Sequence, residues 1–173
     1  MANRAYLFPA NLADVWDRPE GNYYDSRWVI PLAWFFFYRP GDIQMVDVQF
    51  RESKWQEIKF AADMVAAADL FSRRRPLLSS IIENQVDENE VTQLLARLAA
   101  WPGQFLLLDP GEVLAGMKQS EAWHTERCAR ILSMLDSDRP EPRAVMEAIY
   151  PYVGNFHPDA DRRLGQVVGY TYW

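Results

Sequence analysis

Two aromatic and β-branched segments lie at opposite ends of the chain, and they constrain its fold more than any other feature. The first covers residues 3–8 and the second covers residues 166–173. Such side chains suit the pleated, half-buried surface of a sheet, so both segments predict β-strands. Because a free aromatic strand pairs readily with other chains, we expect both strands to lie in one sheet. The chain is then expected to be one complete domain over residues 1–173.

Two internal segments also predict strands. Residues 46–51 alternate between apolar and polar side chains, a pattern typical of a strand with one face in water. Residues 104–108 form a short apolar strand, and Asp109-Pro110 predicts a helix that begins directly after it, with Asp109 as its N-cap. The turn-forming residues between 9 and 26 predict a loop.

The longest apolar run covers residues 28–38 and contains Pro31, which favours the first position of a helix. Because this run is apolar on every side, we expect a short helix at the centre of the core, with a buried strand as the alternative. Further helices are predicted over residues 60–75, 87–101, 120–135 and 140–150, with Pro76, Pro102 and Pro151 ending the first, second and last of them. Together these elements predict an α+β fold, with a small, mainly antiparallel sheet that pairs the N- and C-terminal strands and packs against about five helices.

The charge balance indicates which partners to expect. The formal net charge is -6 and the isoelectric point is about 4.9. Proteins that bind nucleic acids carry a basic stripe, and the one dense basic run here, residues 73–75, is expected at the end of a helix, where it complements the dipole. The apolar run over residues 28–38 is shorter than the ~20 residues that cross a membrane. We therefore expect neither a nucleic acid nor a membrane as partner.

The chain contains one cysteine, Cys128, so it cannot form an internal disulfide. Its first residues lack the basic region and apolar run of a signal peptide. Both observations predict a cytoplasmic protein.

His124 and Cys128 lie four residues apart on the helix predicted over residues 120–135, and Glu121 precedes them. They continue into Ile131 and Leu135, which is the spacing of a buried stripe. A metal site needs three or four ligands, whereas the chain holds two histidines and one cysteine. We therefore predict a packed cysteine, a hydrogen-bonded histidine, and neither metal nor cofactor.

The loop around His157 is the most polar segment. A small hydrolase-type enzyme that pairs His157 with Asp159 or Asp161 in acid–base catalysis is one alternative. A solvated turn in which Asp161 caps a short helix explains the same residues. The chain has neither a nucleophile motif nor a phosphate-binding glycine loop, so no catalytic residue is assigned.

Residues 83–90 concentrate acidic side chains without any base: Glu83, Asp87, Glu88 and Glu90. Such a segment attracts a basic protein partner, although a solvated helix face has the same composition. These four residues are the predicted partner-binding site. A third hypothesis is a homo-oligomeric or small-ligand-binding module with an apolar pocket near Trp28, Trp34 and Phe37.

Four short segments carry a resemblance: residues 3–7, 30–34, 105–109 and 169–173. Together they resemble small, uncharacterised bacterial cytosolic proteins, some of which are encoded beside secreted toxins and are similar to their immunity proteins. The resemblance implies a non-enzymatic protein that binds and neutralises a toxin. It assigns no functional residue.

Overall fold

The computed structural model describes residues 3–13, 23–82 and 85–172. Its strands are β1 (Arg4–Ala10), β2 (Tyr23–Arg27), β3 (Ile43–Phe50), β4 (Ser53–Asp63), β5 (Phe105–Asp109) and β6 (Tyr170–Tyr172). Its α-helices are α1 (Met64–Ile82), α2 (Gln85–Ala100), α3 (Gly111–Ala115), α4 (Glu121–Leu135), α5 (Pro142–Val153) and α6 (Ala160–Val167), and its 3-10 helices are η1 (Leu32–Phe37) and η2 (Pro40–Asp42).

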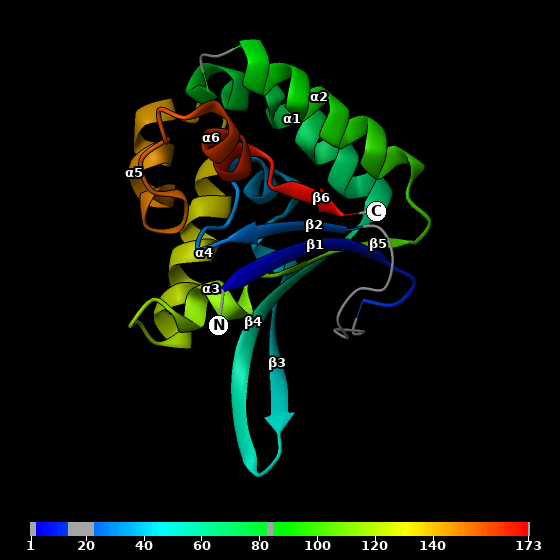
Figure 1. Cartoon of the computed structure of the whole chain (residues 1–173), viewed down its shortest axis with the longest axis vertical. Coiled ribbons are helices and arrows are strands. Elements are labelled where there is room, and N and C mark those ends of the chain that lie inside the picture. Colours follow the sequence, from blue (N-terminus) through cyan, green and yellow to red (C-terminus); the bar gives the residue numbers. More distant parts are fainter. Residues whose placement is uncertain (1–2, 14–22, 83–84, 173) are drawn as a thin grey trace.

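The strands form one sheet in the order β3-β4-β5-β1-β2-β6, and neighbouring strands run antiparallel. Strands β1 and β6 both belong to this sheet, as expected, but they do not pair with each other, because β2 lies between them (Figure 1). The predicted α+β class is therefore confirmed. None of the described helices is both long enough and apolar enough to cross a bilayer.

The two faces of the sheet have different coverings. Leu7, Phe60 and Leu108 point into the main core with η1 and the long helices. The alternate residues on the same strands, among them Tyr6 and Leu107, form a smaller apolar cluster on the opposite face. This alternation follows from the two-residue period of a strand. We call this second side the outer face of the sheet.

The predicted buried helix is confirmed as η1, and all six of its residues are buried. The Phe37 ring stacks on Phe71 of α1 at a centroid distance of 4.4 Å. The indole Nε1 of Trp34 donates to the carbonyl of Val168 at 3.0 Å, so the segment before β6 is fastened to the centre of the core. A large aromatic needs such a partner for its polar atom when it is buried.

Arg74 lies in the middle of α1, where the sequence predicted the end of a helix. Its side chain is 5% exposed, and it donates to the carbonyls of Phe36 and Tyr38 at 3.3 and 2.7 Å. It also pairs with Asp136 at 2.6 Å, at the end of α4. Burial lowers the pKa of Arg74, and Asp136 partly offsets this effect. This guanidinium therefore joins η1, α1 and α4.

Several predicted boundaries are wrong because tertiary pairing overrides local propensity. Residues 60–63 continue β4 and pair with β5, so the expected helix begins only at Met64. It then passes through Pro76, as α5 passes through Pro151, instead of ending there. Strand β2 lies where a loop was expected. Residues 166 and 167 end α6, so the last strand is shorter than predicted.

Several predicted N-caps also differ from the structure. Asp87 lies inside α2, which begins at Gln85. The N-cap of α3 is Pro110, and Asp109 instead accepts a hydrogen bond from the Gly111 N–H at 2.9 Å. Asp159, not Asp161, caps α6 and accepts from the Arg162 N–H at 3.0 Å. Ser120 begins α4 as the predicted boundary requires.

Strands β3 and β4 form a long hairpin that extends away from the helices (Figure 1). Eight residue pairs join the two strands, but β5 pairs only with Phe60–Asp63 of β4. The outer half of the hairpin, residues 46–57, therefore has no further strand beside it in the described structure. Residues 51–56 are all exposed.

Candidate functional site

Two of the four residues of the predicted acidic segment form ion pairs within the fold. Glu83 lies outside the described residues. Asp87 is 2% exposed, and its Oδ2 lies 3.0 Å from Nε of Arg163 on α6. Burial raises the pKa of Asp87, and Arg163 opposes this shift. Glu88 lies 3.7 Å from the guanidinium of Arg75, and Glu90 is half-buried. These pairs use the charges of Asp87 and Glu88 within the fold.

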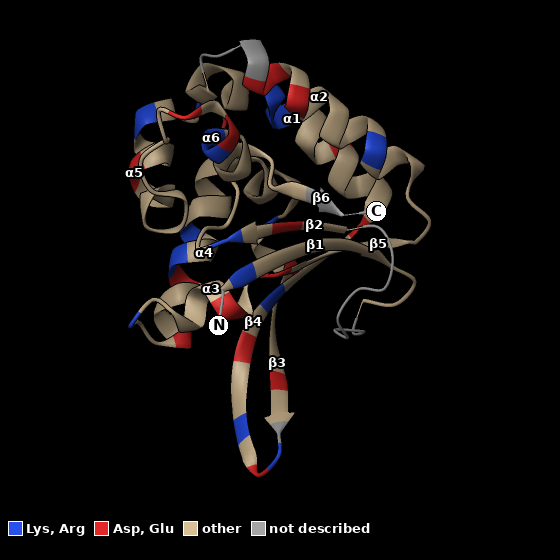
Figure 2. Ribbon diagram, viewed as in Figure 1, with Lys and Arg blue, Asp and Glu red and all other residues tan. Residues whose placement is uncertain are grey.

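A second group of carboxylates lies on the outer face, where the hairpin leaves the sheet. It surrounds a hollow of about 500 Å³ lined by Arg4, Tyr6, Val46, Asp47, Val48, Gln49, Glu57, Lys59, Asp109 and Glu112. Figure 2 shows both acidic and basic residues along the β3–β4 hairpin. We call this group the acid-lined hollow.

Lys59 lies at the floor of this hollow and is only 4% exposed. Its Nζ lies 2.6 Å from Glu57 Oε2 and also contacts Asp109 Oδ1. The sheet register explains the contact between Lys59 and Asp109. Phe60 pairs with Leu108, so Lys59 and Asp109 are the next residues on β4 and β5 and lie beside each other. A buried ammonium needs such partners. The charge of Lys59 is therefore balanced by Glu57 and Asp109 within the hollow.

Arg4 supplies the second cation of the hollow. Its guanidinium lies 2.7 Å from Asp25 of β2, which is 1% exposed, and its backbone N–H donates to Glu112 at 3.1 Å. Asp47 accepts from Gln56 across the hairpin at 2.9 Å. Counting Asp25, five carboxylates surround two cations, so the hollow carries excess negative charge.

Sequence reasoning missed this site because residues 60–63 were assigned to a helix. The signal was present in residues 57–60, where Glu57 and Lys59 alternate with Ile58 and Phe60. This two-residue period indicates a strand with one polar face. Recognising it would have placed Glu57 and Lys59 on one side of β4.

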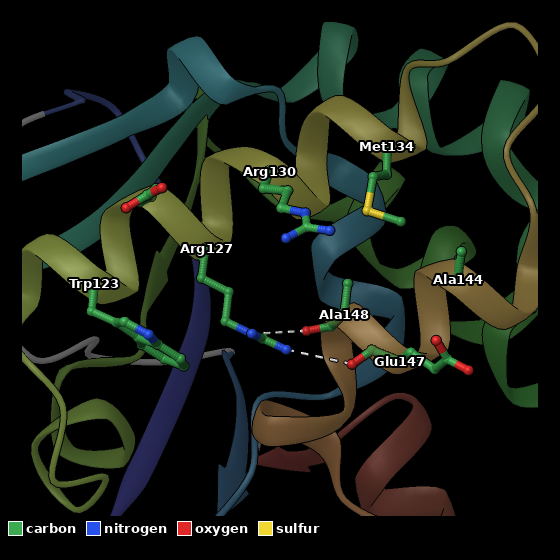
Figure 3. A pocket seen from close by; sticks show the side chains of 8 residues that line it. Trp123, Arg127, Arg130, Met134, Ala144, Glu147 and Ala148 are labelled. Carbon is green, nitrogen blue, oxygen red and sulfur yellow. Dashed lines mark hydrogen bonds between the residues drawn. The ribbon is translucent and has the colours of Figure 1, made fainter.

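A groove of about 320 Å³ separates α4 from α5, and Trp123 and Arg127 line it. Figure 3 shows the Arg127 guanidinium reaching across to the carbonyls of Ala148 and Glu147, at 3.1 and 3.4 Å. Proline has no N–H, so Pro151 leaves the Glu147 carbonyl four residues earlier without its helical donor. Arg127 supplies this donor. We therefore interpret the groove as a helix junction.

The predicted roles of His124 and Cys128 agree with the structure. Cys128 is fully buried, and burial raises its pKa to about 12. Nδ1 of His124 lies 3.2 Å from the Tyr152 hydroxyl, and burial lowers the His124 pKa. In the described part of the chain, no three His, Cys, Asp or Glu side chains gather as a metal site would require.

The geometry around His157 differs from a catalytic dyad. Its Nδ1 accepts from the backbone N–H of Asp159 at 3.0 Å. The Asp159 carboxylate faces the start of α6, and its backbone hydrogen bonds, that from Arg162 foremost, lower its pKa. This arrangement is that of a helix cap.

The three aromatic residues proposed to surround an apolar pocket do not lie together at a surface. Trp34 and Phe37 are closed within the core, at 0% and 1% exposure. Trp28 is 65% exposed and has a positive φ of 67°. The side chains of Trp34 and Phe37 are therefore packed in the core and do not line an open pocket.

Comparison with known proteins gives no relative from which to transfer a function. Neither the protein-family models, nor the curated proteins, nor the solved structures include a match to this chain.

Proposed function

We propose that this chain is a non-enzymatic protein-binding protein that contacts a basic partner with its β3–β4 hairpin and the acid-lined hollow. The observation that carries the proposal is the hairpin itself. Its outer half extends beyond the rest of the sheet (Figure 1) and exposes Trp55 at 40%, and Met45 at its base is 41% exposed. Exposed apolar side chains on a projecting element are typical of interaction surfaces.

Stability alone does not account for such an extension. A two-stranded hairpin outside a sheet is marginally stable in water. Strand β3 lies at the edge of the described sheet, where its backbone groups are available to another strand. A partner that pairs with the edge of β3 and covers Trp55 would stabilise the hairpin and occupy the backbone groups of that edge.

Charge favours a basic partner over an acidic one. The hollow beside the hairpin holds more carboxylates than cations, and the whole chain carries a net charge of -6. Complementary charge accelerates association and selects the partner more than it raises affinity. We therefore expect Asp47 and Glu112 to steer the partner and Trp55 to anchor it.

The finer form of this proposal is a cytoplasmic immunity protein that neutralises a bacterial toxin with a basic domain. The sequence resemblance supports it, as do the acidic charge and the lone, buried thiol. A projecting hairpin suits this task, because it can enter and occlude a concave active site.

The first test is affinity capture from the native bacterium, followed by mass spectrometry at low and high salt. The tagged wild-type chain is compared with the double variant Asp47→Lys/Trp55→Ser. We expect one stoichiometric basic protein with the wild type, and a loss of at least about tenfold with the variant. If capture is unchanged by the variant, the hairpin is not the binding surface.

Two matched charge changes separate the alternatives. Asp138→Lys reverses the charge of an aspartate in the exposed loop after α4, as Asp47→Lys does on the hairpin, and should leave capture unaltered. Glu90→Lys reverses a charge in the predicted acidic segment. If this variant alone lost the captured partner, binding would be assigned to that segment. Sedimentation of the purified chain tests for a second copy as the occupant. Self-association abolished by the double variant would replace the toxin with another copy of this chain.

A further inference from the structure

Strand β3 has one open edge along the outer half of the hairpin, because β4 lies on one side of it and no described strand lies on the other. Natural proteins protect such edges with lysine, proline or a β-bulge. Strand β3 contains neither lysine nor proline, and its register with β4 is continuous, without a bulge. At its base, Thr125 of α4 donates to the Met45 sulfur at 3.4 Å. The open stretch is therefore residues 46–50.

The turn of the hairpin determines which backbone groups face this open edge. Two residues separate the strands, and Phe50 pairs with Ser53 across them. A two-residue turn closes on a hydrogen-bonded pair, and such pairs recur at every second residue of an antiparallel ladder. The even-numbered residues of β3 therefore bond to β4, whereas Asp47 and Gln49 direct their N–H and C=O groups outwards. Both of these residues are exposed.

The side chains beside the open edge determine what an added strand must contain. Val46 and Val48 are half-buried and line the acid-lined hollow. Asp47, between them, accepts a hydrogen bond from Gln56 at 2.9 Å and forms no ion pair among the described residues. Cross-strand neighbours of opposite charge attract, and apolar ones pack together. The edge therefore favours a strand with the pattern apolar–basic–apolar.

We propose that the partner adds an antiparallel strand to β3 along residues 46–50. This strand places a lysine or arginine beside Asp47 and apolar residues beside Val46 and Val48, while its main chain bonds to Asp47 and Gln49. The proposal rests on the proposed function and specifies the segment that the basic partner supplies. A second copy of this chain fits less well, because its β3 carries no base and both copies have a net charge of -6.

The test uses two capped peptides as probes, Thr-Thr-Val-Lys-Val-Thr-Thr and the same peptide with glutamate in place of lysine, titrated into the wild-type chain and followed by ¹H–¹⁵N NMR. The lysine peptide should bind with saturation, shift the amide resonances of Asp47 and Gln49, and bind about fivefold more tightly than the glutamate peptide. Asp47→Lys should reverse this preference. No saturable binding of the lysine peptide, shifts confined to another surface, or equal affinities would each overturn the proposal.

Two variants test the backbone contact separately from the side chains. Gln49→Pro removes an outward N–H and leaves the bonds to β4 in place, because an edge strand tolerates proline where the N–H faces solvent. Gln49→Ala removes the same side chain and keeps the N–H. The lysine peptide should bind Gln49→Pro about fivefold more weakly and Gln49→Ala within about twofold of the wild type. Equal affinities for the two variants would overturn the proposal.

A modified probe keeps the backbone test valid if Gln49→Pro does not fold. The lysine peptide is N-methylated at the backbone nitrogen of its lysine, which removes one main-chain donor and keeps the side chain. It should bind the wild-type chain about fivefold more weakly than the unmodified peptide. Unchanged affinity would overturn the proposal.

Affinity capture distinguishes this proposal from the proposed function. Loss of the captured protein with Gln49→Pro and with Asp47→Lys/Trp55→Ser, but not with Gln49→Ala, would support strand addition. Loss with the double variant alone would keep the hairpin as the binding surface and overturn strand addition. Capture that neither variant changes would overturn both proposals. Self-association that Gln49→Pro abolishes would assign the edge to a second copy of this chain.

Discussion

Around η1, large aromatic side chains are closed off from water, whereas on the β3–β4 hairpin an aromatic of equal size is left exposed. Trp34 is 0% exposed and its indole N–H is bonded to a distant carbonyl. Trp55 is 40% exposed, and its indole N–H donates to Glu57 two residues away. The first residue joins parts of the fold that are remote in sequence, and the second belongs to a local element.

This difference indicates how stability and binding are divided in the molecule. The core holds its elements together through buried contacts between η1, α1 and α4. The hairpin depends on β3–β4 pairing and on the contacts of Lys59 at its base. Substitutions in the core should therefore change stability, and substitutions on the outer hairpin should change binding.

The largest expected effect comes from Arg74. Arg74→Met removes the donor that the Phe36 and Tyr38 carbonyls and Asp136 share, and should lower the free energy of unfolding by about 3 kcal/mol. Urea denaturation measures this change. Arg73→Met, at the exposed neighbouring position, is the control and should stay within about 0.5 kcal/mol of the wild type. Equal losses in the two variants would contradict the assigned role.

Lys59 tests how the hairpin is anchored. Lys59→Met leaves Glu57 and Asp109 facing each other without a cation and should cost about 2 kcal/mol in urea denaturation. Lys54→Met, on the exposed part of the same strand, should cost less than about 0.5 kcal/mol. If Lys59→Met were as stable as the wild type, packing of the lysine stem would suffice to hold the hairpin.

The bond between Arg127 and α5 is expected to have a smaller effect. Arg127→Met should destabilise the fold by about 1 kcal/mol, since the Glu147 carbonyl loses its donor. In a Pro151→Ala background the helix regains its own N–H, so the same substitution should cost less. A double-mutant cycle measures this coupling, and purely additive losses would show that Arg127 does not compensate for Pro151.

The smallest stability change is expected on the hairpin. Trp55→Ser should alter the free energy of unfolding by about 0.5 kcal/mol or less, while it weakens partner capture. Trp101→Ser provides the comparison within the core, because Trp101 is 8% exposed and packs on Tyr24 at a centroid distance of 5.6 Å. That variant should lose about 3 kcal/mol. Comparable losses at both tryptophans would remove the division between core and hairpin.

Patterns that depend on local sequence predicted the fold well. The apolar run over residues 32–37 became the centre of the core, and Ser120 began α4. The stripe of His124 and Cys128 was buried as its spacing required. In each case one helix face or one cap is sufficient to specify the structure.

Features that depend on distant partners were not predictable from single segments. Residues 60–63 have an alanine-rich, helix-like composition, but β5 draws them into the sheet. Arg74 was expected at a helix end because it lies in a basic run before Pro76. Its carbonyl acceptors, Phe36 and Tyr38, are far away in sequence and could not be recognised from this segment. The acid-lined hollow required the pairing of β4 with β5 and of β1 with β2 before its charges could be grouped.

The place of β1 in the sheet has a consequence for folding during synthesis. Strand β1 lies between β2 and β5, and Ala10 pairs with Phe105. Ribosomes add ~5–20 residues per second, so roughly 5–20 s separate these two strands at the exit tunnel. During that interval the aromatic strand β1 has only β2 to pair with. A chaperone at the ribosome would therefore meet β1 and β2 as an incomplete part of the sheet until β5 emerges.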